Sequence, residues 1–298
     1  MNVDVLKPFL DSLASYSNDL LQQLSAGKHL CHYTTLEGAL AIIEGGDLWL
    51  SHLRFSNDEA ELRYGQDLVH DELAQLSGQA DLLPSRRAEL QAIRDRFAAT
   101  RDQSIYIACF CEQADLLSQW RAYADNGGGV SIEFDPVGMQ LFSGPNVPTG
   151  LSRLWRVFYD PAQQRKIVRS CIDYPYWNAA TEDERIEHVV EAIQFFVPTF
   201  KDPGFHGEME RRLIFTPGGP AAPLPRFRVR SGMVVPYVRL RELAPAAFAA
   251  PNARLPILKV MVGPGRHRQL NRDSLEMTLR QRGHADLEVE ASRIPNRH

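Results

Sequence analysis

The sequence predicts an α+β fold in which a mixed, mainly antiparallel sheet is surrounded by helices. Predicted strands come in clusters, for example at 226–231 and 233–240, rather than in the regular strand–helix alternation of a doubly wound fold. No GxGxxG follows a strand, and neither GxSxG nor GxxxxGK[ST] occurs. The sequence therefore gives no support for a Rossmann, hydrolase-elbow or P-loop protein.

The N-terminal third begins with a helix and a strand–helix–strand run. Apolar residues at helical spacing predict a helix over 4–25, in an N-terminal segment, residues 1–28, that packs on the core. A strand runs from His29 to Thr34, and Thr34 with Glu37 forms a capping-box pattern that begins the next helix. Gly45-Gly46 ends this helix, and 48–51 is a second strand. If the two strands pair, Ser51 lies near His32, Tyr33 and Thr34.

The rest of the chain, residues 29–298, is predicted to be a single domain with a helical hairpin inserted at 59–100. The hairpin consists of helices 59–76 and 84–100, with Asn57 or Asp58 as N-cap and with charges that face solvent. Gly127–Gly129 lacks the Lys-Ser/Thr of a phosphate loop, which favours a plain turn. Further strands are predicted at 104–112, 130–134, 151–159, 208–215, 226–231, 233–240, 255–263 and 287–292, and further helices at 116–124, from Pro161, at 181–200 and at 267–282.

Composition and charge favour a cytoplasmic protein with a sizeable core. Of 298 residues, 44% are hydrophobic and 23% charged, with a net charge of −4. This balance gives no argument for an electrostatic grip on nucleic acid or an anionic membrane, but it does not exclude a local basic patch. The stretches 226–230 and 266–268 are two candidates, for which solvated strand and helix faces are the preferred interpretation. No stretch approaches the roughly 20 apolar residues of a membrane span, and the N-terminus lacks a secretory pattern.

The four cysteines, Cys31, Cys109, Cys111 and Cys171, are predicted to be reduced and mostly buried. Cys109 and Cys111 stand two apart on one strand face, which is poor geometry for a disulfide. Their number and spacing do not fit a zinc site, and we expect no metal.

Paired carboxylates give the first candidate site. Glu208 and Glu210 are expected to lie in one strand and to face the same way. Two carboxylates on one face are not both buried and charged without partners. That face is therefore either in water, with Arg212 as a salt partner, or it lines a polar cleft.

The other candidates are aromatic or basic and have ordinary structural explanations. A lone histidine in a strand, such as His32, is more often a hydrogen-bonded core residue than a ligand. Tyr33 is more often core than a cofactor platform. Trp120, Arg121 and Tyr123 fall on a helix, where packing with a snorkelling arginine explains them.

Short motifs along nearly the whole chain, from about residue 29 onward, carry a family resemblance. They are His32-Tyr33-Thr34, Leu36-Glu37-Gly38, Gly46 to Ser51, Arg54, Asn57-Asp58, Glu61, Cys109-Phe110-Cys111, Ser118 to Tyr123, Gly127 to Gly129, Phe205 through Leu213, Val262-Gly263-Pro264 and Ser292 to Pro295. The set resembles the bacterial family known as domain of unknown function 2971. That family is in turn similar to the ADP-ribosyltransferase fold in its His-Tyr-Glu branch, whose members bind NAD in a cleft between two small sheets.

The resemblance implies NAD as co-substrate and no metal. It implies that His32 holds a ribose and the nicotinamide amide, that Glu210 is the catalytic glutamate, and that Glu208 is the acidic residue two positions before it. The central tyrosine has no aligned counterpart. The remaining cofactor-binding candidates are Tyr33, Thr34, Ser51, Arg54, Trp120, Arg121 and Tyr123.

The implied activity is transfer of ADP-ribose from NAD to a macromolecular acceptor, protein or nucleic acid, or hydrolysis of NAD. Bacterial defence and toxin systems are one setting for it. A carboxylate near the ribose would stabilise the positive charge that develops as nicotinamide leaves, and Arg54 or Arg121 would clamp the pyrophosphate. One alternative is an inactive relative that binds a nucleotide, a nucleic acid or a protein. A third hypothesis keeps the fold and transfers phosphate from RNA to NAD.

Overall fold

The computed structural model describes residues 3–16, 29–55, 59–100, 104–143, 147, 149–177, 179–218, 221–230, 232–250 and 253–295. The chain divides into two compact units. Unit 1 consists of Met1–Leu24, His52–Ile105 and Val157–His206, and unit 2 of Ser25–Ser51, Tyr106–Arg156 and Gly207–His298. The predicted insertion at 59–100 therefore belongs to a unit that two further segments of the chain complete.

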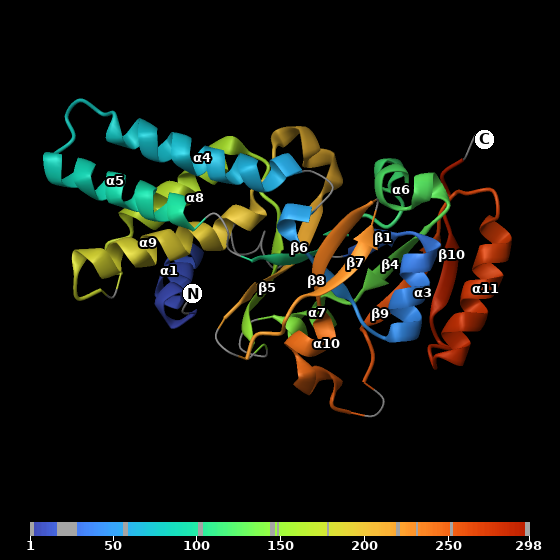
Figure 1. Cartoon of the computed structure of the whole chain (residues 1–298). Helices are drawn as coiled ribbons and strands as arrows, with labels where there is room; N and C mark the ends of the chain where they lie inside the picture. Colours follow the sequence, from blue (N-terminus) through green and yellow to red (C-terminus); the bar gives the residue numbers. More distant parts are fainter. Residues whose placement is uncertain are drawn as a thin grey trace. The chain divides into compact units, whose positions relative to one another are not determined.

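Unit 1 is helical (Figure 1). Its α-helices are α1 (Val3–Tyr16), α4 (Glu59–Ser77), α5 (Pro84–Ala99), α8 (Pro161–Asp173) and α9 (Glu182–Phe196). Asp160 and Thr181 cap the last two through side-chain oxygens that accept from Ala162 N and Glu184 N. The predicted helical hairpin is confirmed, whereas the predicted Asn57 or Asp58 cap and positions 17–25 of the first helix lie outside the described residues.

The charges of the hairpin do not all face solvent. Glu72 of α4 is fully buried and accepts hydrogen bonds from Arg165, at 3.0 Å, and from Arg169. Both arginines lie on α8, so this carboxylate joins two helices of unit 1. Burying an ion pair is tolerated when hydrogen bonds satisfy both partners. The expectation of solvated charges is therefore wrong at this position.

Unit 2 contains a ten-stranded sheet with the order β10-β9-β4-β1-β3-β2-β8-β7, in which β6 also pairs with β3 and β5. β9 and β10 are parallel, and the other pairs with a defined register are antiparallel. The predicted α+β class with a mixed, mainly antiparallel sheet is confirmed. The strands are β1 (Leu30–Thr34), β2 (Trp49–His52), β3 (Tyr106–Cys111), β4 (Val130–Phe134), β5 (Gly150–Arg156), β6 (Glu210–Pro217), β7 (Arg226–Arg230), β8 (Met233–Arg239), β9 (Ile257–Val262) and β10 (Glu288–Ala291).

β3 is the strand on which the sheet branches. It pairs along its whole length with β6, from Tyr106↔Phe215 to Cys111↔Glu210. Because a strand has two edges, its other neighbours β1 and β2 share the second edge, and β1 meets it at Cys31↔Cys111. β1 and β2 therefore do not pair with each other. The predicted proximity of Ser51 to β1 depended on that pairing, so this prediction is wrong.

The turn after β1 differs by one residue from the predicted capping box. Helix α3 (Leu36–Gly45) is capped by Thr35, whose Oγ1 accepts a hydrogen bond from Gly38 N at 3.1 Å. Thr34, the predicted cap, is the last residue of β1. Gly46 ends the helix with a φ of 57°, a left-handed conformation that costs glycine little.

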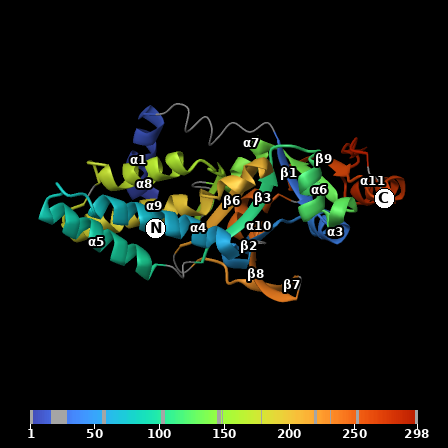
Figure 2. The same ribbon diagram turned by 90° about the horizontal axis from the view of Figure 1, so that it is seen from above.

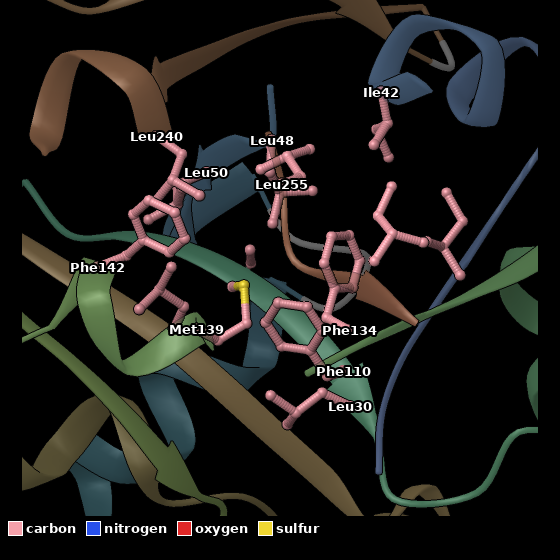
Figure 3. Packing of buried hydrophobic residues seen from close by; sticks show 14 of the residues in the cluster. Leu30, Ile42, Leu48, Leu50, Phe110, Phe134, Met139, Phe142, Leu240 and Leu255 are labelled. Carbon is pink, nitrogen blue, oxygen red and sulfur yellow. The ribbon is translucent and has the colours of Figure 1, made fainter. Parts of the chain in front are cut away.

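The main hydrophobic core of unit 2 lies on one face of the sheet. Leu30 of β1, Phe110 of β3 and Phe134 of β4 point into it, together with Ile42 of α3 and Phe142 (Figure 3). Helices α7 (Pro136–Met139), α10 (Leu240–Leu243) and α11 (Arg268–Gln281) contribute Met139, Leu240, Leu243, Leu275 and Leu279. Burial of each such side chain stabilises the fold by about 1.5–3 kcal/mol. We call this side of the sheet the core face.

Gly129, just before β4, has no room for a side chain. A Cβ there would lie 2.2 Å from Thr34 O and 3.0 Å from Ala124 Cα, both backbone atoms that no rotamer change can move. We expect Gly129→Ala to destabilise the protein by about 1–3 kcal/mol in a urea unfolding experiment. Gly45→Ala is the control, because a Cβ at Gly45 meets nothing within 4 Å. Equal midpoints for the two variants would contradict the close approach of β1 and this turn.

Candidate functional site

The strand register separates the two residues that the resemblance placed in one site. Cys31, Cys111 and Glu210 are directly paired across β1, β3 and β6, so their side chains share one face of the sheet. His32 follows Cys31 and faces the opposite side. His32 and Glu210, which the resemblance places in one site, therefore lie on opposite faces of the sheet. We call the side with Cys31, Cys111 and Glu210 the cysteine face.

His32 is held on the core face by the backbone of β3. Its Nδ1 lies 2.9 Å from Cys109 O, and its ring meets Phe110 edge-on at 6.0 Å between centroids. Burial lowers the pKa of His32, the hydrogen bond to Cys109 opposes this, and the charges of Arg228 and Arg230 lower it further. A neutral imidazole that donates from Nδ1 to the carbonyl fits these surroundings.

Glu208 and Glu210 do not belong to one strand, contrary to the prediction. Glu208 ends the 3₁₀-helix Pro203–Glu208, and Glu210 begins β6. Met209 between them has a φ of 45°, a left-handed conformation that is strained for a residue with a side chain. In the described part of the chain the other non-glycine residues with positive φ are Asp125 and Asn126, just beyond helix α6 (Leu117–Tyr123).

Glu210 is a buried ion-pair residue. Arg212 Nε donates to its Oε1 at 2.7 Å and Nη2 to its Oε2 at 2.9 Å, and the two residues are 5% and 1% exposed. The predicted salt partner is thus Arg212, but the pair lies inside the protein rather than on a solvated face. Burial lowers the pKa of Arg212. The bidentate hydrogen bonds place its guanidinium directly against the carboxylate of Glu210.

Glu208 lies nearer the surface and is held by Tyr123. The Tyr123 hydroxyl donates to Glu208 Oε1 at 2.9 Å, and both residues are partly buried. The neighbouring Cys111 thiol has a pKa of about 11, raised by burial and further by the charges of Glu112, Glu208 and Glu210. This thiol is protonated at neutral pH and is a poor nucleophile.

Tyr33 and Trp120 belong to the buried cluster against which Tyr123 packs. Their rings meet edge-on with centroids 4.8 Å apart, and they pack with Cys31 and Cys111 of the cysteine face. The Tyr33 hydroxyl donates to Gln113 O at 2.8 Å and accepts from Leu116 N at 3.0 Å. Trp120 has no exposed surface, so its ring is a packing group rather than a platform open to a ligand.

Asp115, a residue that the sequence analysis missed, holds Trp120 in place. Asp115 accepts from Trp120 Nε1 at 2.7 Å, from Ser292 Oγ at 2.6 Å and from Arg293 N at 2.8 Å. It thereby ties the loop before α6 to the end of the chain. No local pattern marks Asp115, since its partners lie up to 178 positions away. We call Tyr33, Trp120, Tyr123, Glu208 and the Glu210–Arg212 pair the acid–aromatic cluster.

The other predicted binding residues are not members of this cluster. Arg121 is exposed on α6, two residues before Tyr123. Thr34 is on the core face, with His32, by strand alternation. Ser51 accepts from Arg228 Nη2 at 2.7 Å. Arg54 belongs to unit 1, where its backbone N–H donates to His52 Nδ1 at 3.2 Å.

Glu112 anchors two arginines on the core face. Arg211 Nε donates to its Oε1 at 2.9 Å, and Arg156 pairs with its other oxygen. Burial acts to raise the pKa of Glu112, but hydrogen bonds from Arg156 and Arg211 and their charges outweigh it, so the pKa is lowered. A lowered folded-state pKa gives stability that is present above the unfolded pKa and is lost as pH falls through the folded value.

We therefore expect Glu112→Gln to cost about 3 kcal/mol at neutral pH, because it leaves Arg211, 1% exposed, without its carboxylate. The loss should shrink as pH falls from neutral through the lowered folded-state pKa of Glu112, below which the wild-type side chain is itself protonated. Urea unfolding over this pH range measures both effects. Glu276→Gln on the surface of α11 is the control and should change stability by less than about 0.5 kcal/mol at every pH. A loss independent of pH would count against an ionised Glu112.

Comparison with known proteins bears on the same segments. Residues 119–213 match the family model described as protein of unknown function (DUF2971). This supports the unknown-function family that the chain resembles. The matched region includes Trp120, Tyr123, Glu208 and Glu210, so it contributes two of the three chain segments that form the acid–aromatic cluster, and Tyr33 lies outside it. No curated protein and no solved structure matches the chain.

Other site types have little support within the described residues. They contain no group of three or more His, Cys, Asp or Glu side chains placed to hold a metal ion. None of their helices is both long and apolar enough to cross a membrane. A cavity of about 600 Å³ lies in unit 1, lined by Asp67, His70, Asp71, Arg94 and Asp95 among others, and none of the predicted site residues lines it.

Proposed function

We propose that the acid–aromatic cluster binds NAD and cleaves its nicotinamide–ribose bond, passing ADP-ribose to a macromolecular acceptor or to water. The observation that carries this proposal is the hydrogen bond from Tyr123 to Glu208, which holds a partly exposed carboxylate beside an aromatic ring. Cleavage sends the bonding electron pair to nicotinamide and leaves positive charge on the ribose. A fixed carboxylate stabilises this charge more than it stabilises the ground state.

In this proposal Glu208 takes the role that the resemblance gave to Glu210. The charge of Glu210 is already matched by Arg212, and both side chains are buried. The positive charge of Arg212 neutralises the field of this carboxylate, so Glu210 interacts weakly with a substrate. The pair instead holds the start of β6 in place. Tyr123 orients Glu208, and the exposed Arg121 on the same helix is the candidate for the pyrophosphate.

The branching of the sheet supports an ADP-ribosyltransferase-like split. β1 and β2 share one edge of β3, so the sheet divides into a β1-β4-β9-β10 part and a β2-β8-β7 part at this strand. This arrangement fits the resemblance, in which NAD lies between two small sheets. The split itself stays a proposal, as does a setting in bacterial defence or toxin systems.

A second candidate is an inactive relative that binds a nucleotide, a nucleic acid or a protein without cleaving NAD. The position of His32 favours it, because the histidine faces away from Glu210 and is tied to Cys109 O. Without His32 on the cysteine face, the nicotinamide lacks the anchor that the resemblance implies.

Nicotinamide release separates the two candidates. Purified protein is incubated with NAD, the products are resolved by chromatography, and NAD binding is measured by calorimetry. Binding together with nicotinamide release that depends on Glu208 supports the enzyme. Binding without release supports the inactive relative. Absence of both binding and release overturns the proposal for this protein.

A further inference from the structure

The β7–β8 hairpin carries a row of arginines at an edge of the sheet. β7 is the last strand in the sheet order, and Figure 2 shows it outermost beside β8. Arg226, Arg228 and Arg230 alternate with Phe227 and Val229, so the three arginines share one face of the hairpin. Successive arginines on this face are about 6.8 Å apart along the strand, twice the rise per residue.

Aromatic rings lie on the same face. Arg226 pairs with Tyr237 of β8, and Tyr237 pairs with Ser51 of β2, so the arginine row continues into these residues. Trp49, two residues before Ser51, stacks on Tyr237 with centroids 4.4 Å apart and an interplanar angle of 21°. Trp49 keeps part of its surface exposed. The face thus combines stacked rings with cations.

Arg228 joins the two features. Its guanidinium reaches from β7 across β8, lies 5.4 Å from the Trp49 ring centre and 5.7 Å from that of Tyr237, and donates to Ser51 Oγ at 2.7 Å. These contacts hold the side chain in one orientation without using a carboxylate. Its buried Nε has no hydrogen-bond partner in the described structure. Such a donor raises the cost of burying this cation.

The charges of this face are only partly balanced. Arg226 pairs with Glu242 and Arg239 with Asp47. Within the described residues, Arg228 and Arg230 have no carboxylate at ion-pair distance, in contrast to the buried Arg211 and Arg212. Arg228 and Arg230 also repel each other. An anion placed between them would relieve this repulsion.

We propose that this face of the β7–β8 hairpin binds single-stranded nucleic acid. Phosphates pair with Arg228 and Arg230, and a base stacks on the partly exposed ring of Trp49, which the buried Tyr237 supports. Alternating cations along an extended strand beside the partly exposed ring of Trp49 suit a chain of phosphates and bases. An acidic peptide would use the arginines and leave the rings without a role. The inference is independent of NAD cleavage, because it concerns binding alone.

The test measures binding of fluorescently labelled single strands of DNA and RNA, about ten nucleotides long, by fluorescence anisotropy as salt is varied. Arg228→Gln/Arg230→Gln is expected to weaken binding at least about tenfold and to reduce the salt slope by about 1.4, the value for two lost phosphate contacts on a single strand. Trp49→Leu is expected to weaken binding with the slope unchanged, since stacking releases no counterions.

Arg280→Gln/Arg282→Gln is the matched control, because it removes two exposed charges from the end of α11 in the same unit. It should bind like the wild type, and thermal melts should show that all variants are folded. The proposal is overturned if neither strand binds, if both double variants lose affinity equally, or if duplex DNA or polyglutamate binds as tightly as the single strands. Loss confined to the hairpin variants supports it.

Discussion

Glu208→Gln is expected to reduce nicotinamide release from NAD by about 10²–10³-fold, the effect of removing one preorganised electrostatic group from a transition state. The substitution keeps the shape of the side chain, and the amide oxygen of the introduced glutamine can still accept the Tyr123 hydrogen bond that wild-type Glu208 accepts at 2.9 Å. Only the negative charge is lost. The effect should fall mainly on kcat rather than KM, because the charge matters most when the ribose becomes cationic.

Steady-state kinetics by nicotinamide chromatography measures this effect, with thermal melting as a check on folding. Glu44→Gln, at an exposed position of α3, is the control and should keep wild-type kinetics. If Glu208→Gln turns over NAD at the wild-type rate, Glu208 is not the group that stabilises the cation. If only its KM rises, the residue contributes to binding and not to bond cleavage.

Glu210→Ala is expected to lower the free energy of unfolding by about 3–5 kcal/mol, because it leaves the guanidinium of Arg212 buried without its carboxylate. Arg212 is 1% exposed and donates two hydrogen bonds to Glu210, so the substitution removes both bonds inside the protein. The double variant Glu210→Ala/Arg212→Met removes both charges of the pair and should recover much of the loss. Urea unfolding of the wild type, of Glu210→Ala, of Arg212→Met and of the double variant gives the coupling energy between the two residues.

Measuring both stability and NAD cleavage in the two glutamine variants distinguishes the roles of Glu208 and Glu210. Glu210→Gln should lose stability but, assayed well below its melting temperature, should still cleave NAD, whereas Glu208→Gln should show the reverse. Loss of turnover in a folded Glu210→Gln protein would return the catalytic role to Glu210, as the resemblance implied. Wild-type stability of Glu210→Ala would show that the pair with Arg212 contributes nothing to the fold.

Elements governed by local pattern were predicted within a few residues. Apolar periodicity gave the hairpin helices α4 and α5, and the Gly45-Gly46 pair correctly marked the end of α3. Errors arose where a neighbour competes with the pattern. Thr34 and Thr35 both suit a cap, and β1 pairs with β4 as far as Thr34↔Val130, which leaves Thr35 to cap. Likewise, the run from Glu208 appears continuous in sequence, but Met209 adopts a positive φ, so β6 begins only at Glu210.

The sequence by itself determined the fold class, most of its strands and helices, and the residues from which a site would be built. Strand alternation already required that His32 and Tyr33 face opposite sides. Only the tertiary structure decided that Tyr33 shares its side with Glu210, because that choice depends on the register Cys31↔Cys111↔Glu210 across strands far apart in the chain. A shift of one residue in that register would exchange the two faces, and no local pattern sets it.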